Sequence, residues 1–196
     1  RYMFATRLFS LANMTLIGLT LREQAAPHLR SLAQTTGLTT HMAILEKGEA
    51  VLVSKFEPMG IFRLATWIGK RMDVHCTSLG KALLCQMCEE EVQEIIKAHG
   101  MPRHNENTIA TARKLMQDLA LYAKRGYCLD DEEDEIGLRC IGVPILDHEG
   151  NVMAAISVAG STAQVNRDNI DSLSQLLRDS AAKISQSVGG QRADLG

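Results

Sequence analysis

Residues Gly126–Gly160 read GYCLDDEEDEIGLRCIGVPILDHEGNVMAAISVAG, and the fold of the chain can be worked out from this stretch. Two apolar runs, Leu138–Leu146 and Val152–Gly160, flank a short polar segment, Asp147–Asn151. A Gly-Asn pair at the end of such a segment suits a tight reversal of the chain. The stretch therefore predicts a β-hairpin.

An acidic run, Asp130–Glu135, stands immediately before this hairpin. An isolated carboxylate is costly to bury unless a partner compensates it, so an acid at the edge of a core hairpin indicates a pocket. We predict that Asp130 contacts a ligand and that Asp131–Glu135 form a solvated turn. Cys140 and Ser157 lie inside the two apolar runs, at positions that can face the same side of the hairpin.

The rest of the chain alternates helical patterns with short strand patterns. Residues 14–36 predict a helix that Pro27 kinks or restarts. The strand patterns are Thr39–Glu46, Ala50–Glu57 and Ile61–Ile68, and the later helical patterns are Glu89–His99, Ile109–Arg125 and Arg167–Val188. Because helices and hairpins interleave without regular strand–helix–strand alternation, we expect an α+β domain.

A second informative stretch, DVHCTSLGKALLCQM, covers Asp73–Met87. Thr77 or Ser78 can cap a helix that begins here, which leaves free backbone amides over Ser78–Gly80. Such amides, together with the positive end of the helix dipole, bind anions. An ordinary capped helix without a ligand accounts for the same residues, and the sequence leaves both interpretations open.

Composition excludes several classes of protein. The 196 residues carry a formal charge of -2, which argues against a nucleic-acid-binding domain within them, since such domains carry a basic stripe. The five cysteines, an odd number, fit a reducing compartment better than a disulfide scaffold, so we expect a cytoplasmic protein. No apolar run approaches the roughly 18 residues of a membrane span, and we predict no membrane association.

Cofactor and metal signals are weak. The chain has no GxGxxG pattern and no phosphate-binding loop. His75 and Cys76 could gather with Asp130 and Cys140 around zinc, but no CxxC or HxxxH spacing supports such a site. We therefore predict no cofactor and no metal.

Three segments carry a family resemblance: HCTSLGKALL (His75–Leu84), RGYCLDDEEDEIGLRCIGVPILDHEG (Arg125–Gly150) and VMAAISVAG (Val152–Gly160). Together they resemble the signature stretches of the effector-binding domain of IclR-type bacterial transcriptional regulators. The resemblance implies a GAF-like or profilin-like fold, which is a curved antiparallel sheet flanked by helices.

The resemblance also implies a domain order. Residues 1–20 resemble the end of a winged helix-turn-helix domain and its linker helix, residues 21–190 the effector-binding domain, and residues 191–196 a disordered tail. The DNA-reading part is absent, so operator DNA would be bound through a preceding domain. The resemblance also implies that the protein assembles as a homodimer or a homotetramer.

The family's ligand site can be transferred to this sequence residue by residue. It implies five ligand-binding residues: Ser78, Leu79, Asp130, Cys140 and Ser157. In glyoxylate-sensing relatives, a glycine stands where this chain has Ser78, and a second serine stands where it has Ala159. These differences argue against glyoxylate as the effector.

The sequence thus predicts a sensor of a small carboxylate, keto acid or sugar acid, and not an enzyme. One alternative is a cysteine-dependent enzyme acting on a small acid, in which Cys140 or Cys76 serves as the nucleophile with His75 as the base. Another is a domain that only oligomerises.

Overall fold

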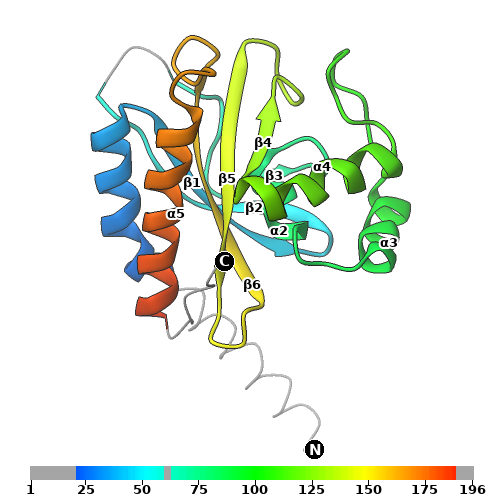
Figure 1. Cartoon of the computed structure of the whole chain (residues 1–196), viewed down its shortest axis with the longest axis horizontal. Coiled ribbons are helices and arrows are strands. Elements are labelled where there is room, and N and C mark those ends of the chain that lie inside the picture. The colour runs from blue at the N-terminus through cyan, green and yellow to red at the C-terminus, as the bar shows by residue number, and fades with distance from the viewer. Residues whose placement is uncertain (1–20, 60–62, 189–196) are drawn as a thin grey trace, which may run out of the picture.

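The computed structural model describes residues 21–59 and 63–188. A six-stranded sheet with the order β3-β2-β1-β6-β5-β4 forms its centre, and every neighbouring pair is antiparallel (Figure 1). Its strands are β1 Thr39–Glu46, β2 Glu49–Phe56, β3 Arg71–Met72, β4 Cys128–Asp131, β5 Leu138–Leu146 and β6 Val152–Ser161. The predicted α+β class and antiparallel sheet are confirmed.

Helices cover both faces of the sheet. The helix over residues 21–36 lies beside α5 on one face, while α2, α3 and α4 lie on the other side (Figure 1). The labelled helices are α2 Ser78–Leu84, α3 Glu89–His99, α4 Ala112–Arg125 and α5 Ile170–Ser187. None of the helices in residues 21–59 and 63–188 has the length and apolarity that crossing a membrane requires.

The central hairpin forms as predicted. Strands β5 and β6 pair antiparallel on either side of a turn that contains Gly150, whose φ of 86° favours glycine. Cys140 lies opposite Ala159, and Ser157 lies opposite Gly142. Cys140 and Ser157 therefore face the same side of the sheet, but they are diagonal neighbours and not a cross-strand pair.

Helix ends follow local rules of the sequence. The hydroxyl of Thr77 accepts a hydrogen bond from the amide of Gly80, and the hydroxyl of Thr111 caps α4 in the same way through Lys114. Gly126 ends α4 in the left-handed conformation at φ 72°. These caps fix where α2 begins, and that position matters for the site.

Two apolar cores lie on opposite faces of the sheet. Leu29 and Leu177 pack with Ile141 and Ile156 under the helix over residues 21–36 and α5. On the other face, the core between the sheet and helices α2, α3 and α4 includes Leu52, Leu83 and Leu115 among its buried side chains. The face toward α2 carries small residues on the central strands, including Ala43, Gly142 and Ala155, so this helix can approach the sheet closely.

The strand predicted at Ile61–Ile68 is wrong. Residues 63–68 form no strand, and the short β3 comes after them. The carbonyls of Leu64 and Thr66 accept hydrogen bonds from the ammonium of Lys55, so a side chain takes the place of a strand partner. Residues 61–62 of that prediction lie outside the described part of the chain.

The helix over residues 21–36 is continuous through Pro27, so the predicted restart does not occur. Predictions for residues 1–20 and for the tail at 191–196 also fall outside the described residues.

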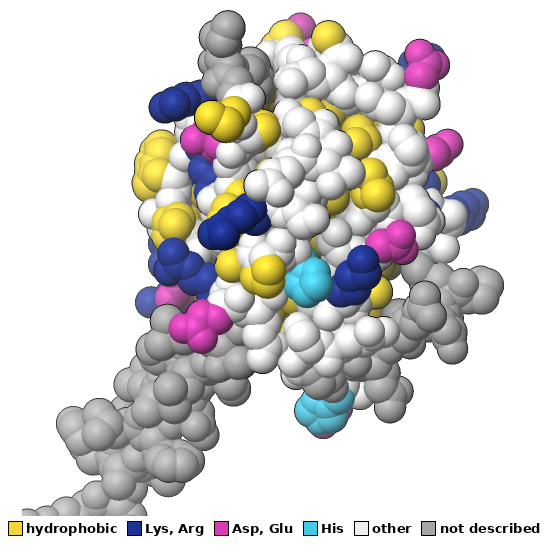
Figure 2. Space-filling view, turned by 90° about the vertical axis from the view of Figure 1, so that its left-hand side faces the viewer, with side chains coloured by type: hydrophobic (Ala, Val, Ile, Leu, Met, Phe, Trp, Pro, Cys, Tyr) yellow, Lys and Arg dark blue, Asp and Glu magenta, His cyan; other side chains and the backbone are white. Residues whose placement is uncertain are grey.

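Figure 2 views the molecule from the side of the helix over residues 21–36 and α5. Positive and negative side chains are interspersed on that face, as the small net charge of -2 leads one to expect.

Candidate functional site

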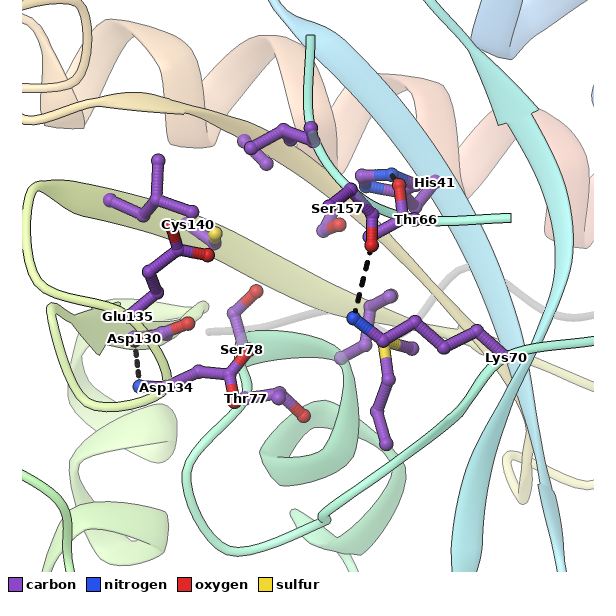
Figure 3. Close-up of a pocket in the computed structure, with 16 residues that line it drawn as sticks. His41, Thr66, Lys70, Thr77, Ser78, Asp130, Asp134, Glu135, Cys140 and Ser157 are labelled. Carbon is purple, nitrogen blue, oxygen red and sulfur yellow. Dashed lines mark hydrogen bonds between the residues drawn. The ribbon is translucent and has the colours of Figure 1, made fainter. Parts of the chain in front are cut away.

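A cavity lies between the start of α2, the β4–β5 connection and the segment over residues 63–70 (Figure 3). It contains about 60 Å³ of free space. The cavity is lined by all five residues that were predicted to bind a ligand, namely Ser78, Leu79, Asp130, Cys140 and Ser157. Ala159 lines it as well. Residues from distant parts of the sequence thus meet at one place.

Strand register explains how the sheet presents its side chains to this cavity. Asp130 of β4 lies opposite Cys140 of β5, which lies opposite Ala159 of β6. One row further along, Ser157 of β6 lies opposite His41 of β1. Because alternate residues of a strand share a face, these five side chains form the sheet side of the cavity.

Two glycines allow the start of α2 to lie directly on the sheet. A Cβ at Gly142 would come within 2.4 Å of the carbonyl oxygen of Ser78, and a Cβ at Gly80 within 2.3 Å of Cα of Val74. Any larger residue at either position would force the first turn of α2 away. Ser78 and Leu79, in the first turn of α2, are thus held at the edge of the cavity.

Asp130 is the buried acid of the site, with 4% of its surface exposed. Burial raises the pKa of its carboxyl to about 7, although the backbone amide of Glu133 donates a hydrogen bond of 2.9 Å to it. A longer contact of 3.4 Å joins the same oxygen to the amide of Asp134 (Figure 3). At neutral pH, Asp130 can therefore act as an acceptor or as a donor toward a ligand.

The solvated turn predicted for Asp131–Glu135 is exposed at Asp131, Asp134 and Glu135, but the prediction is wrong for Glu133. Glu133 is only 7% exposed, and its carboxylate lies 2.6 Å from the ammonium of Lys81, which is fully buried in α2. Asp118 of α4 contacts the same ammonium at 2.9 Å. Burial alone would lower the pKa of Lys81, but the two carboxylates outweigh it and raise the pKa, so Lys81 stays charged and ties the connection to α2 and α4.

The segment over residues 63–70, which we call the roof, covers the cavity opposite the sheet. Thr66 hydrogen-bonds the buried ring of His41 at 2.9 Å, and Lys70 donates to the carbonyl of Ala65 at 3.2 Å. Burial, together with the positive charges of Lys55 and Lys70, lowers the pKa of His41 to about 3. His41 is therefore a neutral hydrogen-bonding group in this site.

Neither candidate nucleophile has the character of a reactive thiol. Burial raises the pKa of the Cys140 thiol well above its usual range, and nearby Asp130 adds to this effect. Burial raises the pKa of Cys76 in the same way. A thiolate is the nucleophilic form of cysteine, so both side chains stay protonated and unreactive at neutral pH.

Sequence reasoning missed His41, Thr66, Lys70, Asp134 and Glu135, all of which line the cavity. His41 carried a readable signal, because a polar residue on the buried face of an alternating strand needs a partner. Lys70 and Thr66 had none, since the roof has no regular periodicity. The role of Lys81 was hidden because lysine inside a helical pattern ordinarily faces solvent.

Comparison with known proteins agrees with this geometry. The family described as "Bacterial transcriptional regulator IclR C-terminal" matches residues 14–186. The chain belongs to the IclR family. It corresponds to the C-terminal, effector-binding domain of such a regulator, so the resemblance seen in the sequence is confirmed.

Several IclR-family relatives are clearly similar in sequence. The chain is 36% identical over 165 residues to the HTH-type transcriptional repressor AllR of Escherichia coli K12, covering 84% of this chain and 61% of AllR. It is 33% identical over 189 residues to the HTH-type transcriptional regulator KdgR of Dickeya chrysanthemi, covering 96% of this chain and 62% of KdgR. The chain thus spans about three fifths of the length of these IclR-family proteins.

Solved structures of IclR-family proteins share the fold. The IclR of Thermotoga maritima superposes with a TM-score of 0.83 at 32% identity, covering 93% of this chain and 74% of that one. The C-terminal domain of KdgR from E. coli superposes with a TM-score of 0.79 at 31% identity, covering 87% of this chain and 99% of that domain. The GAF-like or profilin-like architecture expected of an IclR effector domain is therefore present.

Proposed function

We propose that the cavity beside α2 is the effector site and that its ligand is a small organic acid, such as a short carboxylate, keto acid or sugar acid. The observation that supports this most directly is the buried Asp130, which lines the same cavity as Ser78 and Leu79 at the start of α2. A few convergent polar groups in an otherwise apolar pocket are typical of selective small-molecule sites.

Each lining group has a distinct role in this proposal. The carboxylate of the effector meets the amides of Ser78 and Leu79, with the ammonium of Lys70 nearby to balance its charge. Asp130 accepts hydrogen bonds from a hydroxyl or hydrate of the effector and does not face its carboxylate. Ser157 adds a polar contact from the sheet.

Size limits the effector to a small molecule. A water-sized group occupies roughly 10–15 Å³ on the same measure, so about 60 Å³ has room for about four to six such groups. This suits an acid with few non-hydrogen atoms. A larger sugar acid requires the roof to move outward.

The enzyme alternative has little support. Its nucleophile would have to be Cys140 or Cys76, and the pKa of both thiols is raised by burial. The relatives named above are a transcriptional repressor and a transcriptional regulator. We therefore propose that the domain senses a ligand without transforming it.

In the longer protein, we propose that a preceding domain binds operator DNA and that two or four copies assemble. A two-fold assembly matches the symmetry of a palindromic operator. Light scattering should detect association of this chain at micromolar concentration. A monomer near 21.5 kDa at every concentration would contradict the assembly.

The test of the effector site is a thermal-shift panel of small carboxylates, keto acids and sugar acids, run beside an assay for their consumption. A specific effector at about 100 times its Kd should stabilise the fold by roughly 2.7 kcal/mol, without being consumed. Asp130→Ala should abolish that shift. The control is Asp168→Ala, because Asp168 is an exposed acid that lies outside the cavity.

Two results would contradict this proposal. If Asp130→Ala bound the effector as the wild type does, Asp130 would not contact the ligand. If an acid that binds were also consumed, the cysteine-enzyme alternative would replace the sensor.

A further inference from the structure

Three side chains that commonly bind metals meet beside the effector cavity: His75, Cys76 and His104. Each offers one ligand atom, and these atoms all lie within 4.8 Å of one another. His75 and Cys76 come immediately before α2, whereas His104 lies in the connection between α3 and α4. His75 and Cys76 are neighbours in the sequence, and the fold brings His104 to them.

The hydrogen bonds of the two imidazoles resemble those of metal ligands. Nε2 of His75 lies 3.0 Å from the carbonyl oxygen of Pro102, and Nε2 of His104 lies 2.9 Å from a carboxylate oxygen of Asp73. A histidine that binds a metal commonly donates its other ring N–H to a carbonyl or carboxylate. Donation from Nε2 leaves a lone pair on Nδ1 of each ring.

The loop that carries His104 is held in place independently of any ion. The hydroxyl of Thr108 accepts hydrogen bonds from the amides of His104 and Asn105, at 3.1 Å and 3.0 Å. The same hydroxyl donates to the carbonyl of Glu133 at 2.7 Å. His104 is therefore positioned against the acidic connection that also carries Asp130.

We propose that His75, Cys76 and His104 form a zinc site whose fourth ligand is water or the carboxylate of Asp134. Two imidazoles and one thiolate are ligands that Zn²⁺ prefers, and three protein ligands leave one position open. Binding breaks the S–H bond of Cys76, forms a zinc–sulfur bond and releases the proton to solvent.

The site is accessible and close to the required geometry. Bonds of 2.0–2.3 Å to a tetrahedral ion place the ligand atoms about 3.3–3.6 Å apart, so the three groups have to close by about 1 Å. The side chains of His104 and Asp73 are 35% and 34% exposed. They border an open hollow of about 250 Å³ that Asp134 also lines, so an ion can reach His104 from solvent, while Cys76 is buried behind it.

A bound ion would connect two parts of the effector cavity. Cys76 lies two residues before Ser78, at the start of α2, and Asp134 lines both the hollow and the cavity. Zinc would therefore hold the α3–α4 loop to the segment that presents the Ser78 amide. This role goes beyond effector binding and does not depend on which acid the cavity takes.

The experiment is a titration of tag-free, metal-stripped protein with Co²⁺, which reports thiolate ligation by a charge-transfer band in the near ultraviolet. We expect this band at one equivalent and its loss on addition of Zn²⁺. Cys76→Ser should abolish the band, and His104→Ala should weaken affinity at least 10-fold. The controls Cys88→Ser and His148→Ala, both at exposed residues, should leave binding unchanged.

A second measurement does not depend on Cys76→Ser and tests the site even if that variant fails to fold. Zinc should raise the Tm of the wild type and of His148→Ala, but not that of His104→Ala, whose side chain is partly exposed. The proposal is overturned if the wild type shows no thiolate band, or if the band is lost in Cys88→Ser and kept in His104→Ala.

Discussion

At the scale of the residue, a single carboxyl, that of Asp130, dominates the chemistry of the candidate site. Asp130 is buried, and the backbone amide of Glu133 offsets only part of the cost of its charge, so its pKa rises from 3.8 to about 7. An acid that titrates near neutral pH makes both folding and ligand binding depend on pH. The effect follows from one residue and can be measured through it.

Replacing Asp130 by Asn should change how stability depends on pH. Between pH 4 and 7 the folded wild type binds a proton that the unfolded chain has already released, so its stability falls as pH rises through this window. A pKa difference of this size corresponds to about 4 kcal/mol. Asn does not titrate, so the free energy of unfolding of Asp130→Asn should increase relative to that of the wild type from pH 4 to 7. At pH 8, we expect Asp130→Asn to unfold at a higher urea concentration than the wild type.

Urea unfolding at intervals from pH 4 to 8 measures this directly. Asp168→Asn, at an exposed acid, should follow the wild-type curve. If the difference between the wild type and Asp130→Asn stayed constant over that range, the pKa of Asp130 would not be raised.

At the scale of elements, a buried ion cluster joins helices α2 and α4 to the β4–β5 connection. The ammonium of Lys81 lies 2.6 Å from Glu133 and 2.9 Å from Asp118, and Asp118 also pairs with Arg125 at 3.2 Å. The connection therefore keeps its shape through charge as well as through packing, and Asp130 is held by the same chain segment.

Lys81→Met should destabilise the protein by about 3 kcal/mol, because it leaves Glu133 buried without its partner. Adding Glu133→Gln should recover part of this loss, since the uncompensated charge is removed. Urea unfolding measures both effects. Lys97→Met, at an exposed position of α3, should stay within about 0.5 kcal/mol of the wild type. A loss below about 1 kcal/mol in Lys81→Met would show that the cluster contributes little.

The sequence predicted the positions of helices and strands better than the contacts between segments that are far apart in the chain. The hairpin over β5 and β6, the start of α2 and the limits of α3 follow from turn residues, caps and periodicity, which are local signals. The roof and the Lys81 cluster depend on contacts between segments far apart in the chain. An apolar run such as that before Gly69 cannot be told from a strand when a lysine side chain satisfies its carbonyls.

The candidate site divides in the same way. Asp130 and Ser78 could be predicted from local patterns, because an acid beside a core hairpin and a capped helix start each indicate a group that can bind a ligand. The resemblance to the IclR family implied that Cys140 and Ser157 bind the ligand, and both line the cavity. Lys70 reaches the cavity only because of how the roof folds.

At the scale of the molecule, one strand touches both the cavity and the helix over residues 21–36. His41 of β1 lines the cavity, while the neighbouring Thr40 points to the other face and donates a buried hydrogen bond of 3.0 Å to the carbonyl of Leu29. Leu29 lies in the helix over residues 21–36. This strand therefore links the cavity directly to the helix over residues 21–36.

We predict that an effector changes hydrogen-exchange protection in the helix over residues 21–36, and that Thr40→Val reduces this change without preventing binding. Valine keeps the shape of threonine but cannot donate to Leu29. The control is Ser180→Ala, which removes an exposed hydrogen bond to a helix carbonyl within α5. If Thr40→Val left the transmitted change intact, β1 would not carry the signal.

The tight approach of α2 to the sheet also decides how this site can diversify. The contact between Gly142 and Ser78 leaves no space for a substitution on that side, so a mutation there would damage the fold before it altered recognition. The roof is less restricted in sequence, because residues 63–70 have no regular secondary structure to preserve. If the cavity binds the effector as we propose, selection for a new effector can proceed through substitutions in residues 63–70, while the contact of α2 with the sheet stays unchanged.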